Sequence, residues 1–184
     1  MTRIASTTIK TPLGPFTLIG GDEGLVGAGF TASADDLRPG LASSNGDLQA
    51  VPDLGPLSRA AARYFEGDLE AIDEIPVSQP GSDFQQAAWR EMRRVRPGRT
   101  ISYRDLAGRS GTGSARAAGS ACARNAVALF VPCHRVVQSG GGLGGYYWGR
   151  DRKRWLLDHE RALITLPLDG GALRVDLHSV QRQG

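Results

Sequence analysis

The first eighty residues alternate short apolar runs with turn-forming clusters, a pattern typical of β-strands. Three of these runs are predicted as strands, at residues 4–9, 16–19 and 25–30. Residues 35–53 are rich in Gly, Ser, Pro and Asp and are predicted as a loop. A helix is predicted over 56–65, where apolar side chains recur at helical spacing. The acidic, proline-bounded segment 70–80 is predicted as a strand followed by a linker.

After this first part, the apolar spacing changes to that of helices. An amphipathic helix is predicted to begin at Ser82 or Asp83 and to end at the Pro97-Gly98 pair. Another amphipathic helix is predicted over 150–160, after the glycine-rich loop 139–149. The change of pattern predicts a domain boundary just before the first of these helices.

Two short helices are predicted between them, on either side of a glycine turn at 111–113. The first covers 103–109, and the second covers 115–124 with Ser114 as its cap. Two short helices around such a turn fit a helix-turn-helix, which places its second helix in a groove of DNA. The same spacing is common in helical domains that do not bind DNA, so the pattern alone leaves both interpretations open.

Together the patterns predict an α+β protein with a small α/β domain over 1–80 and a mostly helical, helix-turn-helix domain over 81–160. Residues 161–184 form a C-terminal extension. Two apolar runs in this extension flank Asp169-Gly170-Gly171, a turn signal typical of a β-hairpin. The sequence assigns no function to the hairpin or to the first domain beyond that of a scaffold.

Charge is distributed unevenly between the two predicted domains. Residues 1–80 hold five basic and eleven acidic side chains, whereas residues 81–184 hold seventeen basic and eight acidic ones. This difference predicts that only the second part meets a polyanion such as nucleic acid. Of the 22 basic residues, 20 are Arg, which makes bidentate contacts with phosphate. A GC-rich genome would produce the same bias, so both explanations stay open.

The composition excludes several classes of protein. No apolar run reaches the roughly 18 residues that a membrane-spanning helix needs. The N-terminus lacks the apolar segment of a secretory signal, so the protein is expected in the cytoplasm. Two cysteines cannot form a disulfide scaffold, and their spacing relative to the three histidines does not match a structural zinc site.

Cys133 is the candidate for chemistry, because it directly precedes His134 and follows an apolar run, 129–131, that is predicted as a buried strand. A thiol is a strong nucleophile only as the thiolate, which neighbouring basic groups favour. His134 is a candidate base, and Glu160 is a candidate acid that orients the imidazole. The alternative is a small buried cysteine beside a core histidine. Cys122 lies among alanines and is predicted to be structural.

The segment VPCHRVV, followed by Gly-Gly-Tyr and the helix KRWLLDHE, resembles the active-site region of O6-alkylguanine-DNA alkyltransferases (methylated-DNA–protein-cysteine methyltransferases). The upstream stretch FQQAAWREMRRVRPGRTISYRDLAG, with SARAAGSACARN after it, resembles the helix-turn-helix of the same family. The resemblance covers residues 83–160 closely and residues 1–80 loosely, the latter through TPLGPFTL and YFEGDLE. It implies that the first domain is ribonuclease-H-like.

The resemblance implies chemical roles for five residues. Cys133 would accept the alkyl group, His134 would take its proton through a bound water, and Glu160 would orient His134. Asn125 would brace the loop before the active site. Tyr103 would meet a phosphate and the target base, and would donate a proton to, or polarise, the leaving guanine oxygen.

The resemblance also implies contacts with DNA. Arg116 would be the arginine finger that enters the base stack where the flipped nucleotide was. The residues implied to contact DNA are Tyr103, Ser114, Ala115, Arg116, Ala117 and Gly119. The guanine pocket would be formed by Tyr146 and by the backbone around Val136, Val137 and Tyr147. Small residues beside Arg116 would allow close approach to the minor groove, although they could instead mean tight helix–helix packing.

The implied function is direct reversal of DNA damage by one irreversible transfer of the alkyl group of O6-alkylguanine, and less so of O4-alkylthymine, to Cys133 after base flipping. No cofactor and no metal are implied. The implied partner is double-stranded DNA that carries O6-alkylguanine, and no membrane is involved. The protein is expected to be a monomer, with cooperative assembly on DNA left open.

Three other interpretations stay open at this point. The first is a non-catalytic protein of the same fold that binds alkylated DNA. The second is a cysteine hydrolase that uses Cys133, His134 and Glu160. The third is a helix-turn-helix regulator in which the cysteine is inert.

Overall fold

The computed structural model describes residues 4–42, 47–111, 113–161, 163–168 and 171–176, with side chains up to residue 161. Contacts divide the chain into two compact units. The first contains the residues up to 81 together with 124–131, and the second contains 82–123 and the residues from 132 onward. Segment 124–131, which the sequence placed in the second domain, therefore returns to the first unit. Both units mix helices and strands, which confirms the α+β class.

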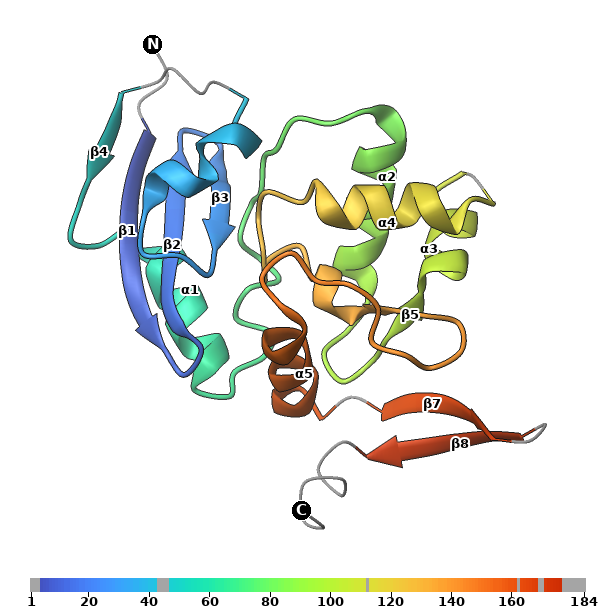
Figure 1. Ribbon diagram of the computed structural model, residues 1–184. Helices are drawn as coiled ribbons and strands as arrows, with labels where there is room; N and C mark the ends of the chain where they lie inside the picture. Colours follow the sequence, from blue (N-terminus) through green and yellow to red (C-terminus); the bar gives the residue numbers. More distant parts are fainter. Residues whose placement is uncertain (1–3, 43–46, 112, 162, 169–170, 177–184) are drawn as a thin grey trace. The chain divides into compact units, whose positions relative to one another are not determined.

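The first unit is built on a four-stranded sheet in the order β3-β2-β1-β4 (Figure 1). Its long strands are β1 (Ile4–Thr11), β2 (Gly14–Gly21) and β3 (Gly24–Gly29). They pair antiparallel in chain order, with Ser6 opposite Ile19 in the first pair. The three strands predicted from the apolar runs are confirmed, with small differences at their ends.

The prediction of a loop over 35–53 is wrong at two places. A 3₁₀ helix, η1 (Ala34–Gly40), follows β3, and strand β4 (Leu48–Ala50) pairs parallel to β1 at the edge of the sheet. The side chain of Ser33 caps η1, and Leu37 within it is buried. The polar composition concealed both elements, because capping residues and loop residues are of the same types.

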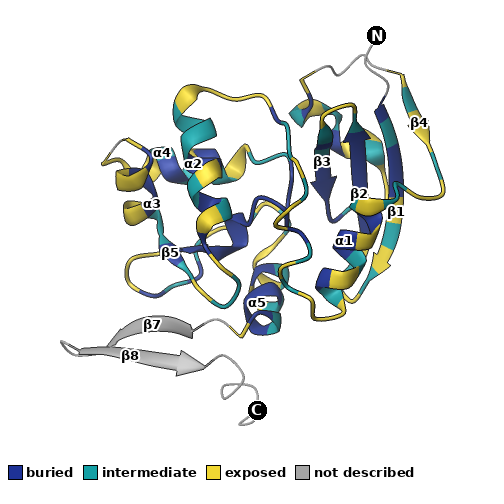
Figure 2. Cartoon of the chain, turned by 180° about the vertical axis from the view of Figure 1, so that it is seen from behind, coloured by how far each residue is buried: buried dark blue, intermediate teal, exposed yellow. Residues whose placement is uncertain are grey.

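Helix α1 (Pro56–Phe65) is confirmed at its predicted bounds and contacts β1 and β2. Its Tyr64 is fully buried, and the rings of Phe16, Phe30 and Phe65 pack against one another. Figure 2 shows the central strand β2 as buried along most of its length. Buried aromatic rings contribute strongly to the hydrophobic stabilisation of a core, and here they join the sheet to its helix.

Two other strand predictions are wrong. Residues 70–75 form turns, and within 70–80 only Val77 makes a bridge, to Leu25. The run 129–131 is not a strand, because the chain turns there and Leu129 adopts a φ of 74°. Short apolar runs identify buried residues, but by themselves they do not distinguish a strand from a buried turn.

The described part of the second unit contains four α-helices, all of them predicted. They are α2 (Asp83–Arg94), α3 (Tyr103–Arg109), α4 (Ala115–Ala123) and α5 (Arg150–His159). The first three pack against one another, and the indole Nε1 of Trp89 donates to the Ala121 carbonyl at 2.9 Å. Ser82 forms a capping box with Gln85 at the start of α2. No helix within the described ranges is long and apolar enough to cross a membrane.

A short parallel pairing determines what lies beside Cys133. Strand β5 (Ile101–Ser102) directly precedes α3 and pairs with β6 (Val136–Val137). Strand β6 directly follows a single 3₁₀ turn, η2 (Cys133–Arg135). The pairing therefore brings Tyr103, at the start of α3, close to the cysteine.

The predicted C-terminal hairpin is confirmed in its pairing. Strand β7 (Leu163–Leu168) runs antiparallel to β8 (Gly171–Asp176), with Leu168 opposite Gly171. The predicted turn residues Asp169 and Gly170 lie outside the described residues.

Candidate active site

Cys133 begins the turn η2, and this turn sends consecutive side chains to different surroundings. Cys133 is 6% exposed and lines a cavity. The next two side chains, His134 and Arg135, are fully buried. The tight turn therefore presents the thiol on a cavity wall and places two cationic or basic groups immediately inside the unit.

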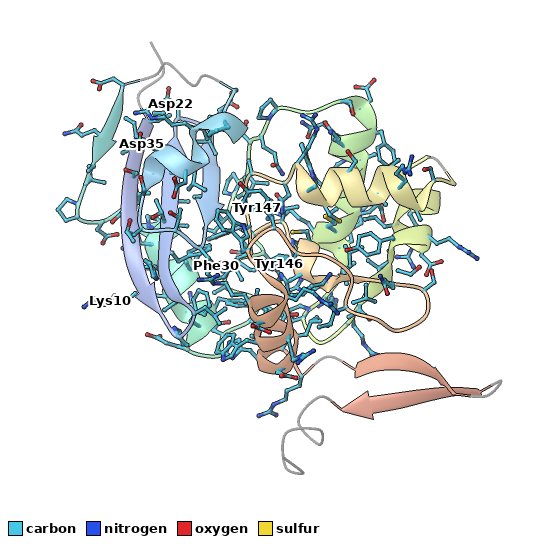
Figure 3. All side chains as sticks on the ribbon, viewed as in Figure 1. Lys10, Asp22, Phe30, Asp35, Tyr146 and Tyr147 are labelled. Atoms are coloured by element: carbon cyan, nitrogen blue, oxygen red, sulfur yellow. The ribbon has the colours of Figure 1, made fainter. Side chains whose placement is uncertain are left out.

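The cavity beside Cys133 has a volume of about 520 Å³, which lies within the range of small-molecule sites. Seven of its lining residues were predicted as site residues: Tyr103, Ala115, Arg116, Gly119, Cys133, Tyr146 and Tyr147. Five were not: Cys122, Ala123, Gln138, Gly144 and Gly145. Figure 3 labels Tyr146 and Tyr147 in the loop that precedes α5. The wall thus combines α3, α4, η2 and this loop.

Four of the residues predicted to contact DNA or to form the guanine pocket do not line this cavity. Val136 and Val137 are buried in β6, and Ala117 is half-buried on α4. Ser114 caps α4 by accepting a hydrogen bond from the Ala117 backbone at 3.3 Å. Val136 and Val137 were predicted as pocket residues but do not line the cavity, whereas residues 144–147 do.

The small residues of α4 differ in what they contact. Ala118 and Ala121 are fully buried, where they pack inside the unit. A Cβ built on Gly119 would meet no atom within 4 Å, so packing does not require a glycine there. Tight packing therefore explains the two alanines, whereas Gly119 leaves open space on the cavity wall.

A buried network of charged groups lies directly behind the thiol. His134 Nε2 is 2.8 Å from Glu160 Oε1, at the end of α5. Arg135 donates from Nε to Glu160 Oε2 and from Nη2 to Oε1, both at 2.9 Å. Its third nitrogen, Nη1, donates to the Val95 carbonyl at 2.5 Å. One carboxylate is therefore shared between an imidazole and a guanidinium.

The charges of this network have identifiable causes. Burial lowers the pKa of His134 below its ordinary value, and Glu160 offsets this only in part, so the imidazole is neutral at neutral pH. Burial alone would raise the pKa of Glu160, but hydrogen bonds from His134 and Arg135 and the positive charge of Arg135 hold that pKa well below its usual range. Since His134 is neutral, Arg135 supplies the permanent positive charge that keeps the carboxylate ionised.

The network also determines the tautomer of His134. A carboxylate accepts hydrogen bonds, so the neutral imidazole donates from Nε2 to Glu160 and keeps its lone pair on Nδ1. Nδ1 is buried and has no hydrogen-bond partner among the residues that the structure describes. Nδ1 of His134 is therefore a proton acceptor in the residue that directly follows Cys133.

Lys153 is a site residue that the sequence analysis missed. It is fully buried on α5, and its Nζ donates to the carbonyls of Val136 at 2.6 Å and Gly145 at 3.0 Å. Nζ is also 3.4 Å from the Tyr103 hydroxyl, which itself donates to the Gly145 carbonyl at 3.3 Å. Burial lowers the pKa of Lys153 to about 8, while negative charge on Cys133 or Cys122 acts in the opposite direction. A signal for it existed, since Lys153 is one of two lysines in an arginine-rich chain.

Asn125 holds the turn that leads to Cys133. Its Nδ2 donates to the Val131 carbonyl at 2.7 Å, and its Oδ1 accepts from the Val127 backbone at 3.1 Å. Gln79 Nε2 donates to the same oxygen at 3.2 Å, and Gln79 was not predicted as a site residue. The side chain thus supplies the hydrogen bonds that strand pairing would otherwise provide. Over the described part of the chain, no three His, Cys, Asp or Glu side chains form a group that could hold a metal ion.

Family comparisons cover nearly the whole described chain. Residues 4–79 match 6-O-methylguanine DNA methyltransferase, ribonuclease-like domain, and residues 83–162 match its DNA binding domain. A methylated-DNA–protein-cysteine methyltransferase from Metallosphaera sedula is 36% identical over 160 residues, which are 87% of this chain and 95% of that protein. One from Salmonella typhimurium is 34% identical over 170 residues, 89% of this chain and 99% of that protein.

Solved structures give the same result. The crystal structure of Mycobacterium tuberculosis O6-methylguanine methyltransferase has a TM-score of 0.71 and 32% identity, covering 87% of this chain and 93% of that chain. The structure of M. tuberculosis OGT in complex with DNA has a TM-score of 0.68 and 31% identity, covering 85% and 92%. Both domains, their order and the fold therefore agree, and this chain belongs to the 6-O-methylguanine DNA methyltransferase family.

Proposed function

We propose that this protein repairs alkylated DNA by one irreversible transfer of an alkyl group from O6 of guanine, and less so from O4 of thymine, to Sγ of Cys133. The observation that carries the proposal is the position of that thiol. It lies on a cavity wall shared with Tyr103 and Arg116, beside a neutral imidazole whose Nδ1 is available as a base. Membership of the family supports DNA repair by alkyl transfer as the general activity.

The proposed reaction is a displacement at the alkyl carbon. The thiol gives its proton, through a water, to Nδ1 of His134, and the thiolate attacks the alkyl carbon. The C–O bond to guanine breaks, its electron pair stays on O6, and the base takes up a proton. Burial raises the pKa of Tyr103, so its hydroxyl stays protonated and can donate that proton to O6 of the leaving base. The product is a thioether, which does not hydrolyse, so each molecule reacts once.

The proposed substrate is a base rotated out of double-stranded DNA, which costs a few kcal/mol of unstacking. Arg116 is exposed on α4 at the cavity wall, where it would fill the gap left in the stack. Gly119 leaves open space beside it for the close approach of DNA. The Tyr146 hydroxyl is buried and has no hydrogen-bond partner among the described residues, so a polar edge of the base would satisfy it.

Transfer of a label tests this proposal directly. Wild-type protein incubated with duplex DNA that carries labelled O6-methylguanine should take up one equivalent of label, and Cys133→Ala should take up none. A hydrolase would release label repeatedly, and a protein that only binds lesions or regulates transcription would acquire none. Any of these results, or equal labelling of Cys133→Ala, would contradict the proposal.

Arg116→Ala should weaken repair in duplex DNA much more than the reaction with free O6-benzylguanine, because only the duplex needs its gap filled. We expect a loss of about tenfold to a hundredfold on duplex, corresponding to about 1–3 kcal/mol of lost contacts. Single-turnover rates on both substrates measure it. Arg90→Ala, which removes an exposed charge that does not line the cavity, is the matched control. Equal losses on both substrates would argue against the finger role.

A further inference from the structure

The cavity wall holds a second thiol for which the proposed reaction has no use. Cys122 lies in the last turn of α4, is half-buried, and lines the same cavity as Cys133. The chain contains only these two cysteines, and neither forms a disulfide in the structure. Sequence alone places them eleven positions apart, in a helix and a 3₁₀ turn, and only the fold brings them to one wall.

The two thiols line one cavity, and both affect the pKa of Lys153. Burial raises the pKa of Cys122, and a negative charge on Cys133 raises it further, whereas the Lys153 ammonium acts to lower it. Both cysteines in turn act on Lys153 and on Tyr103. While Cys133 is a thiolate, Cys122 is therefore held as the protonated, less reactive member of the pair.

We propose that Cys122 is a resolving thiol, which captures oxidised Cys133 as a reversible intramolecular disulfide. The inference rests on the proposed function in one respect, that Cys133 is the reactive thiol. Hydrogen peroxide oxidises the Cys133 thiol to a sulfenic acid and is reduced to water. The Cys122 sulfur then attacks the sulfenic sulfur, the S–O bond breaks, and the hydroxyl leaves as water with the Cys122 proton.

The order of these two steps follows from the charges. The protonated sulfenic acid carries no charge, so oxidation of Cys133 removes the negative charge that adds to burial in opposing ionisation of Cys122. The Lys153 ammonium, with a pKa of about 8, acts to lower the pKa of Cys122 and so favours its thiolate, the form that attacks. Each molecule has one acceptor thiol, so irreversible oxidation of that thiol to the sulfinic acid would abolish alkyl transfer. A disulfide prevents this loss because it can be reduced again.

Peroxide treatment of the full chain, followed by intact mass measurement and reduction with dithiothreitol, tests the inference. Wild type should lose the mass of two hydrogen atoms, run as a monomer without reductant, and recover most of its own untreated transfer to O6-benzylguanine. Cys122→Ser should gain two oxygen atoms and recover little of its own untreated transfer. Ala123→Ser, which alters the same helical turn and cavity wall but keeps both thiols, should also lose two hydrogen atoms and recover most of its own untreated transfer.

The outcomes separate this inference from the proposed function. If untreated wild type transfers alkyl groups, but peroxide drives it to the same oxidised mass as Cys122→Ser, Cys122 is not a resolving thiol. A disulfide that appears only as a dimer on a non-reducing gel would overturn the inference as well. If untreated wild type transfers no alkyl group, the proposed function fails, whereas the mass measurement still reports whether the disulfide forms.

Discussion

Glu160→Gln should slow alkyl transfer to Cys133 by about 100- to 10,000-fold, the contribution typical of general base catalysis. The carboxylate accepts from Nε2 of His134 and thereby keeps the lone pair on Nδ1. An amide at this position can donate as well as accept, so it no longer selects that tautomer, and the imidazole loses the negative charge that supports its basicity. Single-turnover reaction with O6-benzylguanine measures the effect without any contribution from DNA binding.

The same substitution should also destabilise the fold. Arg135 is 1% exposed, and it would lose the charge that its Nε and Nη2 contact. Leaving a buried cation without its partner costs about 3–5 kcal/mol, measurable by urea unfolding.

A double variant separates the two effects. Arg135→Met combined with Glu160→Gln removes both buried charges, so most of the stability should return. Transfer should stay slow, because His134 still lacks its carboxylate. If the double variant recovered both stability and transfer rate, the role of Glu160 would be structural and the proposed base would be wrong.

Gly144→Ala should slow transfer by about 100-fold on both duplex DNA and free O6-benzylguanine, because it displaces Tyr103. A Cβ on Gly144 would lie 2.8 Å from the hydroxyl oxygen and from Cε2 of Tyr103, closer than real contacts allow. Its φ of 70° adds strain for any residue with a side chain. Misplacing a group in an active site by about 1 Å is enough for an effect of this size.

The neighbouring glycine gives a matched control. Gly145 lines the same cavity, but a Cβ there would meet no atom within 4 Å and its φ is not in the left-handed region. Gly145→Ala should therefore transfer alkyl groups close to the wild-type rate. Similar losses in both variants would show that the loop, and not the position of Tyr103, controls the reaction.

The sequence predicted the elements whose signals are local. The four helices of the second unit and the three long strands of the first were predicted because their apolar spacing and caps lie within each segment. The reactive turn could be found in the same way, since Cys133, His134 and Arg135 are consecutive. The errors fell where polar residues build structure, as at η1 and β4, or where a short apolar run is buried as a turn.

The sequence by itself thus determined the fold class, the predicted acceptor thiol and the neighbours of that thiol in the chain. Only the tertiary structure decided what surrounds them. Glu160 accepts hydrogen bonds from both His134 and Arg135, and Lys153 on α5 donates to the Gly145 carbonyl at the cavity. Cys122 and Cys133 line that same cavity. These contacts join residues that are distant in the chain, and they depend on how buried charges find partners. Apolar periodicity reports which residues are buried, but it carries no information about which polar groups meet inside.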